Sequence, residues 1–539
     1  MKLIRVHVIS ADTCGGLLDD LNLWLRNPLM TEEEYQQFDP LCFVGPNGAG
    51  KSQFLQVLTE MFQSAFYACI STDERIEGNH DLQFELEYFI KPRSEHPPAH
   101  VRISRRAVER RKLILVIQQK VGRKWKNCEL SSPDTLALLP KKVIGYTSGD
   151  NETLSLPFLI SRSGYADEVS RVALYENTRD RIVPDTRLML IDYGTNLEVL
   201  VANLLMEDEM QRHELLAHAR LQDLHSFRCI IQLARKPGPQ RTDSGRKGIQ
   251  LTSELEEYLS NLEKCSTCYF VDEKTETYTF DFWVNEDTRK AFKTFWDNTL
   301  QLYSAFHKLA MLNDLVIPKK SRDRFKKNTR ARRFASRLPE PQDEDKVFRF
   351  ERVSFIQDSG ENVVDYVSLS DGEHQQAQLL GTFCMLSFSG VLFVLDEPES
   401  HFNPQWRVKF ISRLRDLHTA NGSRGSESEA SMQECLMTTH SPFLPSDMHR
   451  EKVFIFSKDD DGKVRVENPN IETFGSTFDT IVEACFGVKP PISDLSMEEI
   501  DRLKQTDDPE EIRAGMERLG YSVEKAVIAS RLQQMTEEE

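Results

Sequence analysis

Apolar and polar positions follow one another along the chain in patterns that predict both strands and helices. Residues 41–44 and 391–395 are apolar throughout, which is typical of parallel strands buried on both faces. Residues 82–90 and 101–121 read as further strands, whereas 51–68 and 374–386 read as helices. The predicted fold class is therefore α/β, with a mixed sheet flanked by helices.

The same patterns divide the chain into four parts. Residues 1–160 read as strand-rich around one helix, and residues 346–490 return to strands. Between them, residues 161–345 read as a mainly helical insertion with apolar interruptions at 188–192 and 227–231. Residues 491–539 read as a helical end. Within residues 346–490, the segment 421–431 (NGSRGSESEAS) predicts a polar, mobile loop.

Composition narrows the class of protein. Hydrophobic residues make up 39% and charged residues 28% of the 539, which is typical of a soluble globular chain. There is no run of 18 apolar residues, and the first ten residues lack the apolar core of a secretory signal. Ten cysteines in a chain of this length suit a reducing compartment, so we expect a cytoplasmic protein without a membrane partner.

A glycine-rich loop follows the first buried strand. Residues 45–52 read GPNGAGKS, the G-x-x-x-x-G-K-S pattern of loops that bind nucleotide phosphates. Glycines let backbone N–H groups turn toward phosphate oxygens, Lys51 supplies a charge for the β- and γ-phosphates, and Ser52 offers its hydroxyl to Mg²⁺. We therefore expect ATP and Mg²⁺ as cofactors, held by Gly45, Pro46, Asn47, Gly48, Ala49, Gly50, Lys51 and Ser52.

Two carboxylates end the second buried strand. The carboxyl end of a strand is where α/β sheets bind ligands, so we expect Asp396 to hold Mg²⁺ and Glu397 to orient or deprotonate the attacking water. His440 follows another strand-like run at 436–439, within reach of a γ-phosphate. The predicted catalytic residues are thus Lys51, Glu397 and His440.

Residues 368–373 (SLSDGE) precede the helix at 374–386. Taken alone, they are most simply a helix N-cap. In order with the phosphate loop, the strand-Asp-Glu and the strand-His, they resemble the head of ABC-type ATPases, in which an LSGGQ signature closes on the nucleotide of another head. Asp371 and Glu373 depart from that signature. Ser370 and Gly372, expected at the γ-phosphate, are retained. The resemblance implies a head-to-tail dimer or a larger even-numbered assembly.

The chain runs 317 residues from Ser52 to Leu369, far more than in a transporter subunit. Such an insertion resembles the RecF, SMC and OLD group of soluble ATPases, although no sustained heptad predicts a coiled coil. A zinc hook at Cys265 and Cys268 would need long helical arms, so we expect an ordinary buried pair instead. Residues 459–462 (DDDG) predict a hairpin turn rather than a metal site, and no nuclease site of the chain's own is evident. Gln83, just before the strand-like run at 84–90, is a candidate for the Q-loop glutamine of these ATPases.

Residues 143–149 and 472–479 occur in similar form in bacterial defence ATPases of the OLD-like group. Over roughly residues 1–490 the chain is most similar to the PtuA family, the ATPases of Septu systems and of retrons with a Septu-like pair. The resemblance implies an anti-phage ATPase that controls an HNH-type, PtuB-like nuclease. Retron versions add a reverse transcriptase and its DNA–RNA product, and both contexts stay open. The alternatives are a RecF/SMC-like recombination or repair ATPase, and a scaffold in which ATP is structural.

Charge is distributed unevenly along the chain. The net charge of −17 argues against a general nucleic-acid coat protein. Residues 319–337, however, hold ten Lys and Arg and one acid, enough to neutralise several phosphates, although a solvated helix face or a dock for an acidic partner are alternatives. Residues 491–539 hold 13 Asp and Glu against 6 Lys and Arg. The simplest interpretation of this segment is a solvated tail, and the alternative is a segment that docks a partner. The predicted nucleic-acid or partner contacts are Lys319, Lys320, Arg322, Arg324, Lys326, Lys327, Arg330, Arg332 and Arg333.

Overall fold

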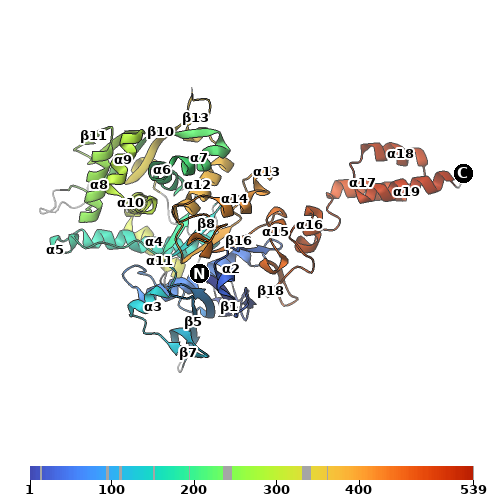
Figure 1. The fold of residues 1–539 in the computed structure, drawn as a ribbon, viewed down its shortest axis with the longest axis horizontal. Coiled ribbons are helices and arrows are strands. Elements are labelled where there is room, and N and C mark those ends of the chain that lie inside the picture. Colours follow the sequence, from blue (N-terminus) through green and yellow to red (C-terminus); the bar gives the residue numbers. More distant parts are fainter. Residues whose placement is uncertain are drawn as a thin grey trace.

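A seven-stranded, mainly parallel sheet forms the centre of the fold (Figure 1). The computed structural model describes residues 1–12, 15–92, 96–108, 112–149, 152–192, 195–234, 246–330, 341–360 and 362–537. Strand β18 runs antiparallel to β17, and every other adjacent pair in the central sheet is parallel. In spatial order the strands are β18 (Val464–Glu467), β17 (Val453–Lys458), β3 (Leu41–Val44), β16 (Glu434–Thr438), β15 (Val391–Asp396), β8 (Lys142–Thr147) and β9 (Leu188–Ile191).

The central strands are buried on both faces, as their unbroken apolar runs predict. Alternate residues of β3 enter different cores: Leu41 and Phe43 join one, and Cys42 and Val44 the other. Strand β15 divides in the same way, with Val391, Phe393 and Leu395 in the second core. The protein is therefore a mixed α/β fold with a parallel-rich sheet.

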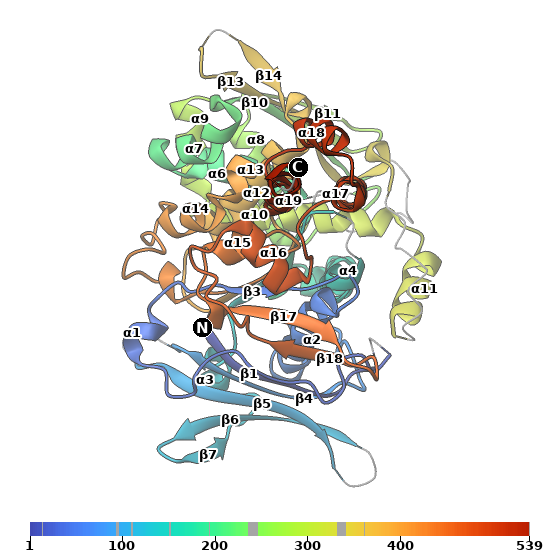
Figure 2. The same cartoon turned by 90° about the vertical axis from the view of Figure 1, so that its right-hand side faces the viewer.

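An antiparallel sheet lies below the central sheet in Figure 2, with helix α2 (Lys51–Cys69) between the two. Most of the 19 residues of α2 are buried, because the helix packs against both layers. The turn predicted at 459–462 joins β17 to β18, with Gly462 at φ +78°. The strands of the antiparallel sheet are β2 (Asn22–Trp24), β1 (Lys2–Ser10), β4 (Gln83–Ile90), β5 (Ala99–Ala107), β6 (Leu113–Val121) and β7 (Lys124–Asn127).

The range 161–345 is less helical than its sequence predicts. Its apolar interruption at 188–192 is β9, an edge strand of the central sheet, and the one at 227–231 lies in a separate five-stranded antiparallel sheet. That sheet also takes strands from beyond residue 345, because β10 pairs with β13. Its strands are β11 (Cys268–Asp272), β12 (Thr277–Trp283), β10 (Leu221–Gln232), β13 (Phe348–Gln357) and β14 (Val363–Asp365).

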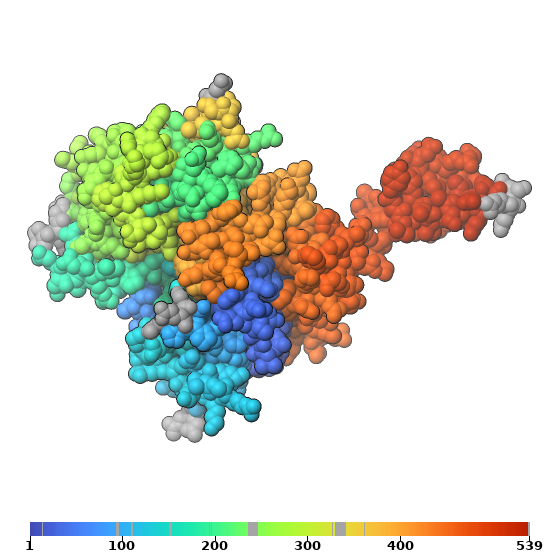
Figure 3. Space-filling model, in the orientation of Figure 1, coloured from blue at the N-terminus to red at the C-terminus, as the bar shows by residue number. Residues whose placement is uncertain are grey.

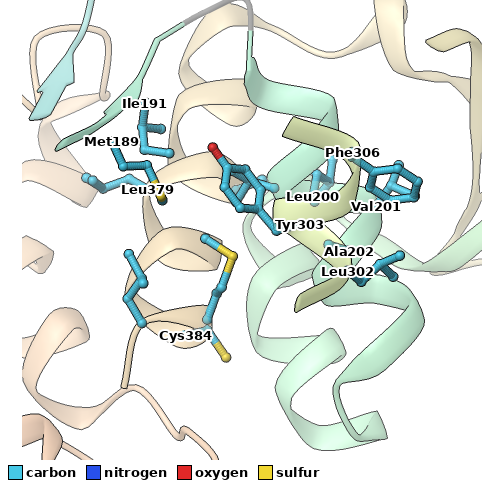
Figure 4. Close-up of a cluster of buried hydrophobic side chains, with 14 of the residues drawn as sticks. Met189, Ile191, Leu200, Val201, Ala202, Leu302, Tyr303, Phe306, Leu379 and Cys384 are labelled. Atoms are coloured by element: carbon cyan, nitrogen blue, oxygen red, sulfur yellow. The ribbon is translucent and has the colours of Figure 1, made fainter. Parts of the chain in front are cut away.

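Helices join this sheet to the central one through a continuous apolar core. Figure 4 shows part of it: Tyr303 and Phe306 of α10 (Thr299–Met311) lie among side chains of α6 (Asn196–Met206), β9 and α12 (Asp371–Met385). The other α-helices in the described part of residues 1–490 are α1 (Glu32–Tyr35), α3 (Pro133–Ala137), α4 (Glu152–Val172), α5 (Glu176–Arg179), α7 (Glu209–Leu216), α8 (Ser253–Cys265), α9 (Glu286–Phe295), α11 (Lys319–Arg330), α13 (Pro404–Arg407), α14 (Phe410–Asp416), α15 (Phe443–Ser446) and α16 (Phe478–Phe486).

The polar segment 421–431, predicted as a mobile loop, is instead fastened to the core. Arg424 is 1% exposed, and its guanidinium donates hydrogen bonds to the side chain of Gln433 at 2.8 Å and to the carbonyl of Phe383 at 2.7 Å. Burial lowers the pKa of Arg424 to about 10, so it stays charged at neutral pH. Composition alone predicts solvation here because it does not register that one buried cation orders the loop around it.

We expect Arg424→Met to destabilise the fold by about 2–4 kcal/mol, because it keeps the length of the side chain but leaves a buried carbonyl without its donor. Arg415→Met is the matched control: the Arg415 side chain is 58% exposed, and we expect its loss to change stability by less than about 0.5 kcal/mol. Urea-induced unfolding measures both free energies. Equal values for the two variants would contradict a structural role for Arg424.

The C-terminal end is a separate group of three helices, α17 (Asp494–Gln505), α18 (Pro509–Arg518) and α19 (Val523–Glu537). They pack around a small core of their own, formed by Ile500, Leu503, Ile512 and Ile528. In Figure 3 this group stands apart from the rest of the molecule. Among the described helices of the whole chain, none combines the length and apolar character that crossing a membrane requires.

Candidate nucleotide site

The phosphate loop lies between the end of β3 and the start of α2. Gly45 adopts φ +131°, and a Cβ at this position would lie 2.2 Å from the carbonyl oxygen of Phe456, so no larger residue fits. Gly50 caps α2 in the left-handed region at φ +97°. The loop therefore opens at the N-terminus of a 19-residue helix, where backbone N–H groups and the helix dipole favour an anion.

Lys51 points back across the loop. Its Nζ donates hydrogen bonds to the carbonyls of Gly45 at 2.9 Å and Pro46 at 3.2 Å, and lies 3.1 Å from His440 Nε2. Lys51 as a whole residue is 5% exposed. Burial lowers the pKa of Lys51, while the carboxylates of Glu397 and Asp396 act in the opposite direction. A single cation is thus held at the centre of the loop.

Ser52 and Asp396, 344 residues apart in sequence, lie side by side. The Ser52 hydroxyl donates to Asp396 Oδ1 at 3.0 Å, and the Thr438 hydroxyl donates to the same oxygen. Burial raises the pKa of Asp396, and these two hydrogen bonds oppose the rise. One hydroxyl and one carboxylate next to a phosphate loop are the oxygen ligands that Mg²⁺ prefers, so these residues fit the ion.

Glu397 and His440 face each other beside the loop. Glu397 Oε1 lies 3.3 Å from His440 Nε2, and both side chains are partly exposed. Burial, with a smaller contribution from the charge of Lys51, lowers the pKa of His440. Glu397 adopts φ +49°, a backbone conformation that non-glycine residues hold only where neighbouring contacts enforce it. The pair could orient a water against a γ-phosphate.

Ser370 and Gly372 lie at the N-terminus of helix α12. Ser370 is the N-cap and forms a capping box with Glu373, whose backbone N–H it accepts at 3.4 Å. A Cβ on Gly372 would lie 2.6 Å from the carbonyl oxygen of His401, so glycine is required there. Within the described chain, no hydrogen bond joins Ser370 or Gly372 to residues 45–52, and their nucleotide role stays a prediction.

The predicted basic run forms α11 up to Arg330. The side chains of Lys319, Lys320, Arg324 and Lys327 are exposed. Arg322 is less available to contact nucleic acid or a partner, because its guanidinium pairs with Asp167 and donates to the carbonyl of Ile317. Arg332 and Arg333 lie outside the described residues, as do the side chains of Lys326 and Arg330.

Two other predictions are placed differently by the structure. Gln83 begins β4 of the antiparallel sheet and accepts the Ala107 backbone N–H at 3.2 Å, so it is not at the phosphate loop. Cys265 is buried at the end of α8, but Cys268 is exposed at the start of β11. The expectation of a buried pair is therefore wrong for Cys268, because β11 is the edge strand of its sheet.

No role in the site was predicted from the sequence for three of its residues: Thr438, Thr439 and Glu399. Thr438 holds Asp396, and the Thr439 hydroxyl donates to the buried Glu399. The available signal was a pair of threonines at the end of an apolar run, immediately before His440. Polar residues there interrupt the apolar pattern, which indicates hydrogen bonding at the end of the strand.

Residues 270–447 match a protein family described as “AAA domain, putative AbiEii toxin, Type IV TA system”. The matched range includes Ser370, Asp396, Glu397 and His440, whereas the phosphate loop precedes it. This part of the chain is therefore similar to ABC-like, AAA-type P-loop ATPase domains, and that similarity points to the use of ATP and Mg²⁺. A search of curated proteins finds no match to the chain.

Proposed function

We propose that the chain is the ATP-binding and hydrolysing subunit of a bacterial anti-phage defence complex, built on an ABC-type head. The observation that carries the proposal is the hydrogen bond between Ser52 and Asp396, which brings two distant motifs into one Mg²⁺-binding geometry. His440 Nε2 lies 3.1 Å from Lys51 Nζ and 3.3 Å from Oε1 of Glu397, the residue after Asp396. This arrangement supplies the charge neutralisation and water positioning that phosphoryl transfer needs.

The proposed working unit is a head-to-tail dimer, or a larger even-numbered assembly. Ser370 is exposed at the N-terminus of the 15-residue helix α12, where N–H groups favour an anion. In this proposal two ATP–Mg²⁺ are enclosed between the Gly45–Ser52 loop of one chain and Ser370 and Gly372 of another. Each closed site then contains residues of both copies.

The proposed partner is an HNH-type, PtuB-like nuclease whose activity follows closure of the ATPase. The matched family is described by a toxin and a toxin–antitoxin system, which supports a toxic activity that another component regulates. The resemblance to the PtuA family supports an HNH-type nuclease as the toxic component. In a retron context, the reverse transcriptase and its DNA–RNA product are further proposed partners. A RecF/SMC-like repair ATPase would need no such nuclease.

Co-purification from the native operon tests the partnership. The chain, tagged and expressed with its neighbouring genes, is expected to retain an HNH nuclease encoded beside it at a fixed stoichiometry. Glu397→Gln and wild-type complexes are then compared for nuclease activity with and without ATP. An operon without an HNH gene would favour the RecF/SMC-like repair ATPase. A nuclease activity that does not change with ATP in either complex would favour it as well.

The exposed face of α11 is proposed to contact nucleic acid. The double variant Lys319→Ala/Lys320→Ala should reduce the slope of log affinity against log salt by about 1–2, since each lost duplex phosphate contact removes about 0.9. Affinity should fall similarly for unrelated sequences, as expected for contacts to phosphates. Fluorescence anisotropy with a labelled duplex at several salt concentrations measures both.

The matched control is Lys504→Ala/Lys525→Ala, two lysines of the acidic C-terminal helices. It removes the same charge from a region where we expect no nucleic acid. A slope that changes equally in both double variants would show that only the total charge matters, and would remove α11 as a binding surface.

A further inference from the structure

Two neighbouring threonines tie the loop of His440 to the turn that carries Glu397. The Thr438 hydroxyl donates to Asp396 Oδ1 and accepts the Glu397 backbone N–H at 3.1 Å. The Thr439 hydroxyl donates to Oε1 of Glu399, which lies two residues after Glu397 in the same turn. Thr439 is 0% and Glu399 2% exposed, so water does not compete for this second hydrogen bond.

The two ties flank Glu397 on either side. Between them its backbone is held at φ +49°, and its carbonyl accepts the Ser400 backbone N–H at 3.1 Å. A non-glycine residue in this region costs about 1 kcal/mol or more, so the flanking contacts must hold it there. The Glu399–Thr439 bond is the contact on the C-terminal side.

Thr439 is itself fixed to the phosphate-loop strand. Its backbone N–H donates to the carbonyl of Phe43 on β3 at 3.0 Å, and its hydroxyl accepts the Ser441 backbone N–H at 2.9 Å. The residue before His440 and the residue after it are therefore both held through one hydroxyl. Moving Glu399 away would release the His440 loop and the Glu397 turn together.

We propose that Glu399 and Thr439 are positioning residues for ATP hydrolysis, whose hydrogen bond holds Glu397 and His440 in register with each other and with the phosphate loop. This inference rests on the proposed ATPase function. Neither residue is expected to touch the nucleotide, since both are buried behind the pair that faces it. Both act through Glu397 and His440.

What Glu399 supplies is a hydrogen-bond acceptor rather than a charge. Its other oxygen, Oε2, is buried and has no hydrogen-bond partner among the described residues. Burial also raises the pKa of Glu399 to about 7, with the Thr439 hydrogen bond acting against the rise. Glutamine at this position keeps an oxygen that accepts the same hydrogen bond from Thr439, so Glu399→Gln separates the acceptor from the charge.

Threonine variants test the proposal directly. Thr439→Val keeps the branched shape and removes the hydroxyl, and should lower kcat for ATP hydrolysis by about 10- to 100-fold, because a misplacement near 1 Å costs this much. The KM and the dissociation constant for ATP should stay within about twofold, since residues 45–52 are unchanged. Thr439→Ser restores the hydroxyl and should recover most of kcat.

Glu399 supplies the same comparison from the other side of the bond. Glu399→Leu should reproduce the loss of kcat and Glu399→Gln should recover it, while thermal unfolding confirms that each variant is folded. The proposal is overturned if Thr439→Val hydrolyses ATP like the wild type. It also falls if the Val and Leu variants lose ATP affinity and folding along with kcat, because the bond would then be structural. Absence of hydrolysis by the wild-type chain would instead overturn the proposed function itself.

Discussion

Glu397→Gln is expected to lower kcat for ATP hydrolysis by about 100- to 1000-fold while ATP stays bound. The carboxylate lies 3.3 Å from His440 beside the phosphate loop, and an amide in its place cannot accept a proton from water. The residues expected to bind ATP and Mg²⁺, namely 45–52 and Asp396, are untouched. ATP should therefore hold the enclosed dimer together, so that the variant elutes as a dimer with ATP and as a smaller species without it.

Steady-state phosphate release and light scattering after gel filtration measure the two effects. Glu467→Gln is the matched control, since this exposed carboxylate ends β18 at the edge of the same sheet and should leave turnover unchanged. Normal turnover by Glu397→Gln would assign water positioning to another group. Slow turnover without ATP-dependent dimerisation would support the catalytic role of Glu397 but contradict a dimer that encloses ATP.

Lys51→Met is expected to weaken ATP binding by about 100-fold and to abolish measurable hydrolysis. The change keeps the length of the side chain but removes the one cation at the centre of the loop, and a close charge–phosphate contact is worth about 3 kcal/mol. Stability should change little, because the loss of hydrogen bonds to two loop carbonyls is offset by relief from burying an ammonium.

Calorimetric titration with ATP measures the affinity of this variant. Lys458→Met, at the exposed end of β17, removes a neighbouring lysine of the same sheet and should bind ATP like the wild type. If Lys51→Met binds ATP normally, the loop at 45–52 is not the nucleotide site. If it loses affinity but the wild type hydrolyses no ATP, the nucleotide is a structural ligand and the scaffold alternative holds.

The local sequence pattern was sufficient to predict the strands and the loop that carry the residues of the nucleotide site. The loop at 45–52 and the carboxylates at 396 and 397 each follow an unbroken apolar strand, and burial on both faces of a central sheet produces that pattern. Their meeting at the Ser52–Asp396 hydrogen bond was expected because carboxyl ends of parallel strands share one edge of a sheet.

Pairing between distant segments could not be predicted in the same way. Strand β9 reads as an apolar interruption among helices, and nothing local shows that it joins β8 at the edge of the central sheet. The pairing of β10 with β13 likewise crosses the expected boundary at residue 345. The burial of Arg424 and Glu399 could not be predicted for a related reason: composition predicts that charged residues are solvated, and only the folded chain shows the partners that bury them.

A mixing experiment tests most directly the central claim, that ATP is hydrolysed between two copies of the chain. Lys51→Met removes the phosphate loop of one copy. Ser370→Asp keeps a good N-cap for α12 but places a negative charge where the γ-phosphate is expected. Each variant alone should be inactive. A mixture should hydrolyse ATP well above either variant, because one site then combines an intact loop with an intact Ser370. A mixture as inactive as its components, or a fully active Ser370→Asp, would contradict the two-chain site.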